Sequence, residues 1–380
     1  YEHGEVFVTH DGMETDLDIG NYERFVDINL DGTANPTSGK IYLSVIQKER
    51  RGDYLGKTVQ VIPHITDEIK NRITEHCQDY EIGIIEIGGQ PGDAESPHFI
   101  EAIRQMKKDL GRENVCYVHV VPLLYIEHLW EYKTKPIQNS IRELRQSGIT
   151  PQLLVCRTPD TIPENIRSKI SLFGDVEDED VIEAANAPTI YEVPLVLAAQ
   201  DMHRRLEEKL WLKRKDPDLK EWEAFVNNIK EPKKEIHLGI IGKYAEIEDA
   251  YASVKEAIIH AGAKYSTKVH RHWIHSEAIE NDPLYLEKHS EEVWLDAMIV
   301  PGAFGKRWTE GKIAAIKFAR EHDIPYLGIC IGLQLAVVEY ARNVCGTQNA
   351  HSTELADEGE AFIHYLPDQD DSMDKWGTMR

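Results

Sequence analysis

Cysteine and long apolar runs are both scarce in this sequence of 380 residues. Its five cysteines are odd in number, far apart and without a Cys-x-x-Cys pair: Cys77, Cys116, Cys156, Cys330 and Cys345. This pattern excludes a disulfide framework, argues against a zinc site made of cysteine pairs and fits a reducing compartment. No apolar run approaches the roughly 20 residues that a membrane-spanning helix needs, so we expect a cytoplasmic protein that does not enter a membrane.

Positively charged residues are fewer than negatively charged ones. The sequence has 43 Lys and Arg against 66 Asp and Glu, a formal net charge of −23. Tight nucleic-acid binding depends on Lys and Arg contacts to phosphate, so we expect no nucleic-acid partner. An anionic ligand would need a local basic pocket or a bridging metal ion. With 41% hydrophobic residues and no internal repeat, the chain is long enough for two or three folded domains.

Short apolar runs alternate with longer amphipathic segments along the chain, which is typical of parallel sheets covered by helices. We therefore predict an α/β protein with two parallel-sheet domains of three layers. A highly charged stretch separates them, so the predicted domains are residues 1–212 and 236–380, joined by a linker at 213–235. Expected strands lie at 82–87, 152–156, 236–241, 295–300 and 324–329, and expected helices begin at Ser96-Pro97 and span 311–321.

A cysteine flanked by glycines is the sharpest chemical signal. The expected strand at 324–329 runs through Gly-Ile-Cys-Ile-Gly at 328–332 directly into a helical stretch at 333–343. This is the form of a nucleophile elbow, in which glycines allow a strained turn and the helix N-terminus favours a thiolate at Cys330. The alternative is that Cys330 is a small buried core residue.

A glycine-rich turn at 301–305 strengthens the catalytic interpretation. The turn follows the expected strand at 295–300 and contains Gly302, Ala303 and Phe304. Backbone N–H groups in such a turn can stabilise the oxyanion that forms when a thiolate attacks a carbonyl group. Nucleophile and oxyanion hole would then lie at the ends of adjacent strands.

Motifs in both halves of the chain, in order, resemble the CTP synthase family. The resemblance to its glutamine amidotransferase domain rests on Lys-Tyr at 243–244, on 301–305, on Gly-Lys-Ile at 311–313, on 328–332 with Gln334, and on Ser-Thr-Glu at 352–354. The resemblance to its synthetase domain rests on His-Gly-Glu-Val-Phe-Val at 3–8, Glu-Thr-Asp-Leu-Asp at 14–18, Tyr-Glu-Arg-Phe at 22–25, Arg-Gly-Asp-Tyr-Leu-Gly at 51–56, Val-Gln-Val-Ile-Pro-His at 59–64 and Lys-Thr-Lys-Pro at 133–136.

The resemblance implies a P-loop-like synthetase domain over 1–212 and a class I glutamine amidotransferase domain over 236–380. It implies a ligase that releases ammonia from glutamine at Cys330 and passes the ammonia to the other domain. There the enzyme would aminate C4 of UTP, after ATP phosphorylates O4, and release CTP. Mg²⁺ as cofactor, GTP as allosteric activator and a homotetramer are further implications of the resemblance.

The resemblance also assigns roles to single residues. Cys330 is the implied catalytic nucleophile, and the implied oxyanion and glutamine-binding residues are Gly302, Ala303, Phe304, Gln334 and Glu354. The implied contacts to UTP or CTP are Asp93, Glu95, Lys133, Gln138 and Lys169, and the implied metal ligands are Asp18 and Glu86.

The carboxylates themselves are compatible with metal binding and with simpler roles. Glu86 interrupts the apolar run at 82–87, where a buried carboxylate needs a cation or a metal ion. Asp16 and Asp18 would share one side of an extended segment and could supply oxygen ligands to Mg²⁺. A structural salt bridge for Glu86 and a solvated acidic pair at Asp16 and Asp18 are the alternatives.

Glycines and lysines of the first half could bind phosphate groups. Gly88, Gly89 and Gly92 follow the first expected strand, at the sheet edge where α/β proteins bind ligands, and glycine backbone can approach a phosphate closely. Lys133 and Lys135 would point the same way from an extended segment. A simple tight turn and ordinary surface lysines are the alternatives.

The sequence departs from the family pattern at several places. It contains no Gly-x-x-x-x-Gly-Lys-Ser/Thr phosphate loop, and no His-x-Glu base motif follows Cys330, where the only histidines are His351 and His364. We expect both motifs in flanking segments of a longer protein. Gln90-Pro91 replaces the usual Thr-Val, Ile137 replaces a threonine, and Ala303 replaces a second glycine of the oxyanion turn.

The leading hypothesis is therefore a glutamine-dependent member of the CTP synthase family. A second hypothesis is a non-catalytic relative that keeps the nucleotide pockets and acts as a regulatory or assembly subunit, because the departures cluster near the implied sites. A third is an amidotransferase for another acceptor, which the affinity for UTP would distinguish.

Overall fold

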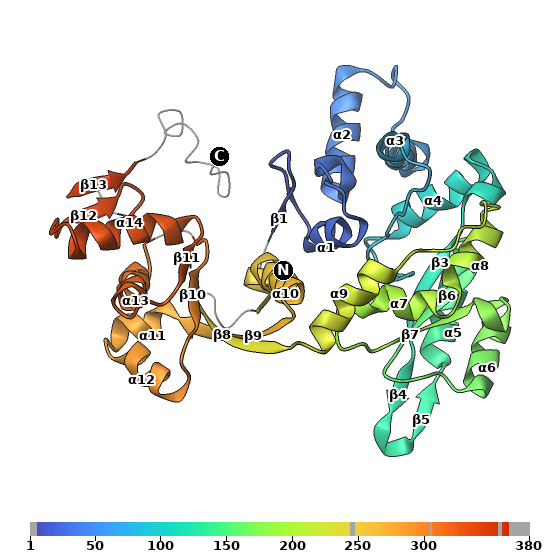
Figure 1. The fold of residues 1–380 in the computed structure, drawn as a ribbon. Helices are drawn as coiled ribbons and strands as arrows, with labels where there is room; N and C mark the ends of the chain where they lie inside the picture. Colours follow the sequence, from blue (N-terminus) through green and yellow to red (C-terminus); the bar gives the residue numbers. More distant parts are fainter. Residues whose placement is uncertain (1–5, 244–247, 304–305, 356–358, 365–380) are drawn as a thin grey trace. The chain divides into compact units, whose positions relative to one another are not determined.

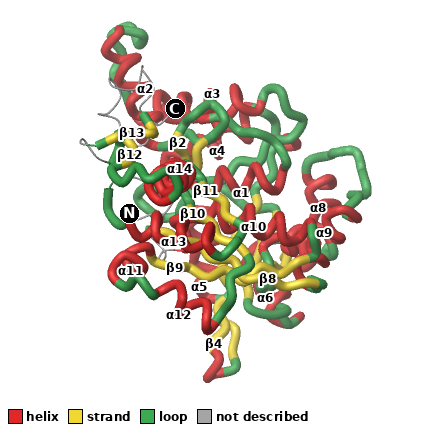
Figure 2. The backbone as a smooth tube through the Cα atoms, turned by 60° about the vertical axis from the view of Figure 1, so that its left-hand side comes forward, coloured by secondary structure: helices red, strands yellow, loops and turns green. Residues whose placement is uncertain are grey.

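The computed structural model describes residues 6–243, 248–303, 306–355 and 359–364. These residues form two compact units, which are traced along the sequence in Figure 1 and coloured by secondary structure in Figure 2. The middle unit is Thr33–Val226, and the two-segment unit combines the described residues of Tyr1–Gly32 and Asn227–Arg380. Each unit contains a parallel sheet with helices, which confirms the predicted α/β class.

The predicted linker at 213–235 contains helix α9 (Lys220–Lys230). Trp222, on this helix, donates a hydrogen bond from its indole nitrogen to the backbone oxygen of Tyr191 at 2.7 Å. The domain limits at residues 212 and 236 stay a prediction.

The middle unit has a three-stranded parallel sheet in the order β3-β6-β7, formed by Val118–Pro122, Leu153–Thr158 and Val181–Ala185. The antiparallel hairpin of β4 (Leu124–Ile126) and β5 (Glu131–Lys133) follows β3 in the chain. Its helices include α2 (Ser38–Arg51), α3 (Thr66–Cys77), α4 (Pro97–Asp109), α5 (Lys135–Gln146), α6 (Glu164–Gly174), α7 (Val193–Ala198) and α8 (Met202–Lys209).

Apolar residues one turn apart on the helices cover this sheet. Ile137 and Ile141 of α5 are buried against Leu154 of β6 in one core cluster. This spacing gives α5 a single apolar stripe, so the helix can bury one face and leave the other in water.

Two predictions for the middle unit are confirmed. The expected strand at 152–156 corresponds to β6, whose first four residues are buried. The expected helix beginning at Ser96-Pro97 is α4, and its apolar face buries Ile100 and Met106.

The predicted strand at 82–87 is wrong. The structure has no regular secondary structure there, and Ile84 is 90% exposed. A parallel strand forms only where a neighbour satisfies its N–H and C=O groups. Within the described residues the middle sheet consists of β3, β6 and β7, and none of them pairs with this run.

The two-segment unit has a four-stranded parallel sheet in the order β11-β10-β8-β9. Its strands are β8 (Lys234–Gly242), β9 (Thr267–His275), β10 (Ala297–Val300) and β11 (Tyr326–Gly328). The helices include α1 (Leu17–Val26), α10 (Ala252–Lys264), α11 (Ser276–Asn281), α12 (Tyr285–Glu292), α13 (Thr309–Glu321) and α14 (Ile331–Asn343). Smaller pairs are β1 (Phe7–Val8) with β2 (Glu14–Thr15), antiparallel, and β12 (Ala350–Ser352) with β13 (Glu360–Ile363), parallel.

The core of this unit lies between the sheet and helices α13 and α14. Val300 of β10, Ile316 of α13 and Leu335 of α14 belong to one buried cluster. The strands expected at 236–241, 295–300 and 324–329 and the helix expected at 311–321 are confirmed as β8, β10, β11 and α13. Across the described part of the chain, no helix is both long and apolar enough to span a membrane.

Candidate active site

Two neighbouring strands end where the candidate nucleophile lies. Strands β10 and β11 are parallel, with Val300 opposite Gly328, so the segments that follow them leave the same edge of the sheet. Gly302 follows β10 and Cys330 follows β11. A β-carbon placed on Gly302 would lie 3.5 Å from the β-carbon of Cys330, which shows how closely the two turns approach.

The turn around Cys330 requires its two glycines. A β-carbon at Gly328 would lie 2.5 Å from the carbonyl carbon of Gly332, and one at Gly332 would lie 2.1 Å from the backbone oxygen of Val300. Cys330 has φ 55° and ψ −113°, a strained conformation for a residue with a β-carbon. Its side chain is exposed, so the alternative of a buried core cysteine is wrong.

Hydrogen bonds hold this strained turn in place. The backbone N–H of Ile329 donates to the oxygen of Val300 at 3.0 Å, and the hydroxyl of Tyr326 donates to the oxygen of Gly332 at 2.8 Å. Burial raises the pKa of Tyr326, which keeps its hydroxyl protonated as a donor.

Helix α14 begins directly after Cys330. The backbone N–H groups of Leu333 and Gln334 donate to the oxygen of Cys330 at 3.0 and 3.2 Å. The partial positive charge of the helix N-terminus stabilises an anion at this end of the helix. Gln334 lies in the first turn of α14, which begins directly after Cys330.

Strand β12 contacts Gln334 through Ser352. Ser352 donates a hydrogen bond from its hydroxyl to the side-chain oxygen of Gln334 at 3.1 Å. The backbone N–H of Glu354 donates to the same hydroxyl oxygen at 3.4 Å. Gln334 and Glu354, which the family resemblance assigns to glutamine binding, are thus joined through one serine.

A buried lysine completes this part of the site. Lys312, on α13, is only 2% exposed. Burial, with the positive charge of Lys243, lowers the pKa of Lys312 to about 8, while the charges of Cys330 and Glu354 act in the opposite direction. The ammonium group therefore sits within electrostatic range of the candidate nucleophile and of a candidate glutamine ligand.

Of the remaining residues predicted for the glutamine site, Ala303 lies within the described residues. Ala303 is half-buried and packs against the core of the two-segment unit. Phe304 lies outside the described residues. Of the two histidines after Cys330, His351 is buried and its Nδ1 lies 2.9 Å from the backbone oxygen of Ser352, whereas His364 is exposed.

In the middle unit, Asp93 and Glu95 lie on an exposed loop. The backbone N–H of Gln90 donates to Oδ2 of Asp93 at 2.6 Å, so Gln90 takes part in closing this turn. A β-carbon at Gly92 would lie 3.0 Å from a carboxylate oxygen of Glu143, which places the loop beside helix α5.

The other predicted nucleotide contacts lie on β5, α5 and α6. Lys133 ends β5 and pairs with Glu131 at 2.6 Å. Gln138 donates from its side chain to the hydroxyl of Thr134 at 3.1 Å, and Lys169 is exposed on α6. The extended segment expected for Lys133 and Lys135 is wrong, because Lys135 is already the first residue of α5.

Ile137 does not face the ligand side of this region. Its side chain is buried in the core of the middle unit. Ile137 therefore contributes to the core packing of α5.

The predicted metal ligands lie in different units. Asp18 is exposed in the first turn of α1 and lines a cavity of about 250 Å³ with Arg24, Lys255 and Glu256. Asp18 is helical, so the extended Asp16–Asp18 segment is wrong. Glu86 is also exposed, so the burial expected for its carboxylate is wrong. In the described part of the chain, no three His, Cys, Asp or Glu side chains gather as a metal site.

Comparisons with known proteins identify the family. The family model described as CTP synthase N-terminus matches residues 1–212, and that described as glutamine amidotransferase class-I matches residues 246–368. The CTP synthase of Methanocaldococcus jannaschii is 55% identical over 384 residues, which cover all of this chain and 71% of the relative. The chain belongs to the CTP synthase family. The CTP synthase of Carboxydothermus hydrogenoformans is 50% identical over 383 residues, again covering all of this chain and 71% of the relative.

A solved structure, the glutaminase domain of Trypanosoma brucei CTPS with bound acivicin, is also similar. It is 34% identical, covers 33% of this chain and 48% of its own, and superposes with a TM-score of 0.31.

As a CTP synthase family member, the chain is a glutamine-hydrolysing ligase that forms a carbon–nitrogen bond, as predicted. These comparisons give no support to the hypothesis of a non-catalytic relative.

Sequence analysis assigned no role to two residues that the structure brings to the candidate site. Lys312 lies on an amphipathic helix, where a lysine is normally on the exposed face. Ser352 is part of the Ser-Thr-Glu motif, whose spacing alone does not show a contact with Gln334. Both residues belong to motifs that carry the family resemblance, Gly-Lys-Ile at 311–313 and Ser-Thr-Glu at 352–354, and this membership was the available signal.

Proposed function

We propose that Cys330 is the nucleophile that releases ammonia from glutamine in the CTP synthase reaction of this chain. The observation that carries this assignment is the exposed cysteine in a strained turn, between two obligatory glycines and at the start of α14. The ammonia is the nitrogen donor for UTP, and ATP supplies the driving force.

The glutamine half of the reaction follows from thiolate chemistry. The sulfur of Cys330 attacks the carboxamide carbon and forms a carbon–sulfur bond, and the carbonyl electron pair moves onto oxygen. Backbone N–H groups of the turn with Gly302, Ala303 and Phe304 would stabilise this oxyanion. When the carbonyl re-forms, the carbon–nitrogen bond breaks and the nitrogen leaves as ammonia after taking up a proton. Water then hydrolyses the thioester to glutamate.

Gln334 and Glu354 are proposed to orient the glutamine. The carboxylate of Glu354 complements the α-ammonium group of a free amino acid, and the side-chain amide of Gln334 can donate to an oxygen of the substrate. Gln334 lies in the first turn after Cys330 and is linked to Glu354 through Ser352, which supports a single substrate site.

The UTP half is assigned to the middle unit. Lys133 and Lys169 supply positive charge for the triphosphate, while Asp93, Glu95 and Gln138 supply hydrogen-bonding groups for UTP or the product CTP. ATP transfers a phosphoryl group to O4 of UTP, ammonia then forms the bond to C4, and phosphate leaves with the C4–O4 electron pair.

The metal proposal rests on the chemistry of its donors. Asp18 and Glu86 are exposed carboxylates, and carboxylate oxygens are the ligands that Mg²⁺ prefers. Mg²⁺ bound at either carboxylate would neutralise nucleotide phosphate charge. Because the described residues form no three-ligand cluster, phosphate oxygens would have to complete the coordination. Activation by GTP, a homotetramer and a cytoplasmic location complete the proposal.

One assay tests these assignments. The full-length enzyme is incubated with UTP, ATP and Mg²⁺, with either glutamine or ammonium chloride as nitrogen source, and CTP is measured. We expect Cys330→Ser to lower glutamine-dependent synthesis by ~10³-fold or more and to retain ammonia-dependent synthesis. Cys345→Ser, which changes another exposed cysteine, is the matched control and should retain both activities. Failure of the unmodified enzyme to make CTP from either source would contradict the function.

A further inference from the structure

Ser352 is the buried link between two elements of the glutamine site. It lies on β12, is 1% exposed and uses its hydroxyl in two hydrogen bonds. The hydroxyl donates to Oε1 of Gln334 on α14 and accepts from the backbone N–H of Glu354 in the turn after β12.

The bond from the Ser352 hydroxyl to Oε1 orients the Gln334 amide. A serine hydroxyl has a single hydrogen and two lone pairs, so the hydroxyl that accepts from Glu354 still has its one hydrogen for Oε1 of Gln334. With its oxygen engaged in this way, Gln334 has its NH₂ group left to donate. A substrate oxygen would therefore meet a donor at this position.

We propose that Ser352 is a positioning residue for glutamine, which orients the Gln334 amide as a hydrogen-bond donor. This inference rests on the proposed assignment of Gln334 and Glu354 to glutamine binding. In this proposal the Ser352 hydroxyl acts on glutamine through Gln334 and makes no contact of its own with the substrate.

A purely local role for Ser352 does not explain both bonds. A serine that accepts from the N–H two residues later forms a common turn, and this describes the contact with Glu354 alone. The bond to Gln334 joins residues 18 positions apart on separate elements. The bond to Gln334 has the additional effect of orienting the Gln334 side-chain amide.

The surrounding contacts keep β12 and α14 in a defined relation. Arg342 of α14 donates from Nε to the backbone oxygen of Ala350 on β12 at 2.8 Å. Lys312 lies within electrostatic range of Glu354. The frame around the Ser352 hydroxyl is thus set by other contacts, so loss of this hydroxyl should disturb the amide orientation more than the fold.

The test is Ser352→Ala in the full-length enzyme. We expect KM for glutamine to rise between about two- and ten-fold, the range for one lost hydrogen bond, with kcat little changed. Ammonia-dependent CTP synthesis should stay at the unmodified level, which also reports that the protein is folded. Ser352→Cys keeps a weaker donor at similar size and should give an intermediate KM.

Ser266→Ala is the matched control. The hydroxyl of Ser266 also donates a hydrogen bond to a side-chain amide oxygen, Oδ1 of Asn228, at 3.3 Å. Ser266 is the residue immediately before β9. The control should leave KM for glutamine unchanged. An equal rise in KM in both variants would overturn the inference.

A double-mutant cycle separates positioning from general structure. If Ser352 acts through Gln334, the variant with both Ser352→Ala and Gln334→Ala should have the same KM as Gln334→Ala alone. Additive effects in the cycle would overturn the inference, as would an unchanged KM in Ser352→Ala beside a raised KM in Gln334→Ala. An unchanged KM in Gln334→Ala would instead contradict the proposed glutamine site.

Discussion

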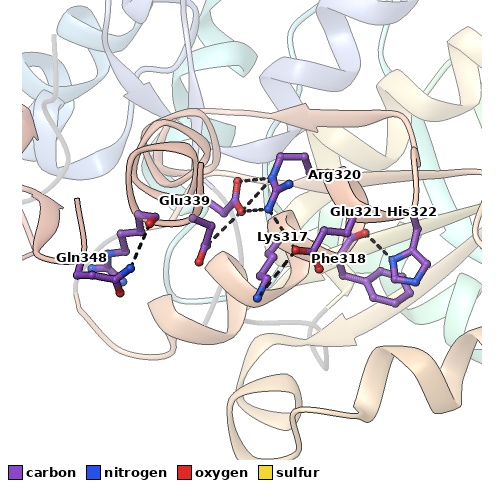
Figure 3. Close-up of polar contacts among 9 residues, drawn as sticks. Lys317, Phe318, Arg320, Glu321, His322, Glu339 and Gln348 are labelled. Carbon is purple, nitrogen blue, oxygen red and sulfur yellow. Dashed lines mark hydrogen bonds and ion pairs between the residues drawn. The ribbon is translucent and has the colours of Figure 1, made fainter. Parts of the chain in front are cut away.

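Arg320 of α13 and Glu339 of α14 form a forked ion pair between the two helices that frame the candidate nucleophile. Nε of Arg320 donates to both carboxylate oxygens of Glu339 at 3.1 and 3.2 Å, and Nη2 donates at 2.9 Å (Figure 3). The side chain of Glu339 is 2% exposed and that of Arg320 is 33% exposed. The pair fastens the helix that carries Lys312 to the helix that carries Gln334.

Removal of the arginine should destabilise the two-segment unit. In Arg320→Ala the buried carboxylate of Glu339 loses its cation, and we expect the free energy of unfolding to fall by about 3 kcal/mol. Urea denaturation followed by tryptophan fluorescence measures the change. Lys317→Ala is the control, because Lys317 and Glu321 are 4.0 Å apart and both exposed, so its effect should stay below about 0.5 kcal/mol. Equal effects of the two variants would refute the importance of the pair.

Gly332 should tolerate no side chain. In Gly332→Ala the new β-carbon would meet the backbone oxygen of Val300 at 2.1 Å, so the turn of Cys330 must shift. We expect loss of glutamine-dependent CTP synthesis and a lower thermal unfolding midpoint. Gly39→Ala on α2 is the control with the opposite sign, because nothing lies within 4 Å of its added β-carbon. Alanine there should stabilise the helix by up to about 1 kcal/mol. Normal glutamine use by Gly332→Ala would contradict the tight elbow.

Lys312 should make stability depend on pH above neutrality. Its pKa is lowered to about 8 in the folded protein from the ordinary value of 10.5. Between these values the unfolded state binds more protons than the folded state, so this contribution makes the protein more stable as the pH rises. Below pH 8 both states carry the charge, and the penalty for burying it is fully present.

Comparison with Lys312→Met isolates this effect from other titrating groups. From pH 8 to 10.5 the difference in free energy of unfolding should move in favour of the unmodified protein, by on the order of 3 kcal/mol. Denaturation series at several pH values measure it. A difference that does not change with pH would show that the lysine is not buried as a charge.

Ile137→Thr restores the residue usual in the family and tests whether this departure concerns nucleotide binding. Because Ile137 is packed in the core, the hydroxyl would be buried and we expect stability to fall by about 1–3 kcal/mol. KM for UTP should not change. Ile137→Val is the control, with a loss near 1 kcal/mol. An improved KM for UTP in Ile137→Thr would show that residue 137 reaches the ligand.

The sequence pattern predicted a strand correctly where the fold also gives that strand a hydrogen-bonded neighbour. The runs that became β8, β10 and β11 are short, apolar and bounded by turn residues, and each one has a parallel neighbour in the fold. The turn at Cys330 could also be predicted from the sequence. The close approach of Gly332 to Val300 leaves room only for glycine, and this glycine is part of the sequence motif.

The run at 82–87 shows where such signals fail. It is as apolar as the true strands, yet a strand also needs hydrogen-bonding partners, and a single segment does not specify them. The expected burial of Glu86 depended on this strand and is wrong for the same reason. Ile137 was counted among the departures near the implied sites, and its side chain is buried in the core by the packing of α5.

Glycine spacing and ordered motifs are properties of contiguous residues, so they were enough to indicate the family, the reaction, the α/β class and Cys330 as the candidate nucleophile. The burial of Lys312 within range of Cys330, and the link between Gln334 and Glu354 through Ser352, could be seen only in the folded chain. Helix α14 packs against both α13 and β12. Desolvation and hydrogen bonding there depend on neighbours that are distant in the sequence.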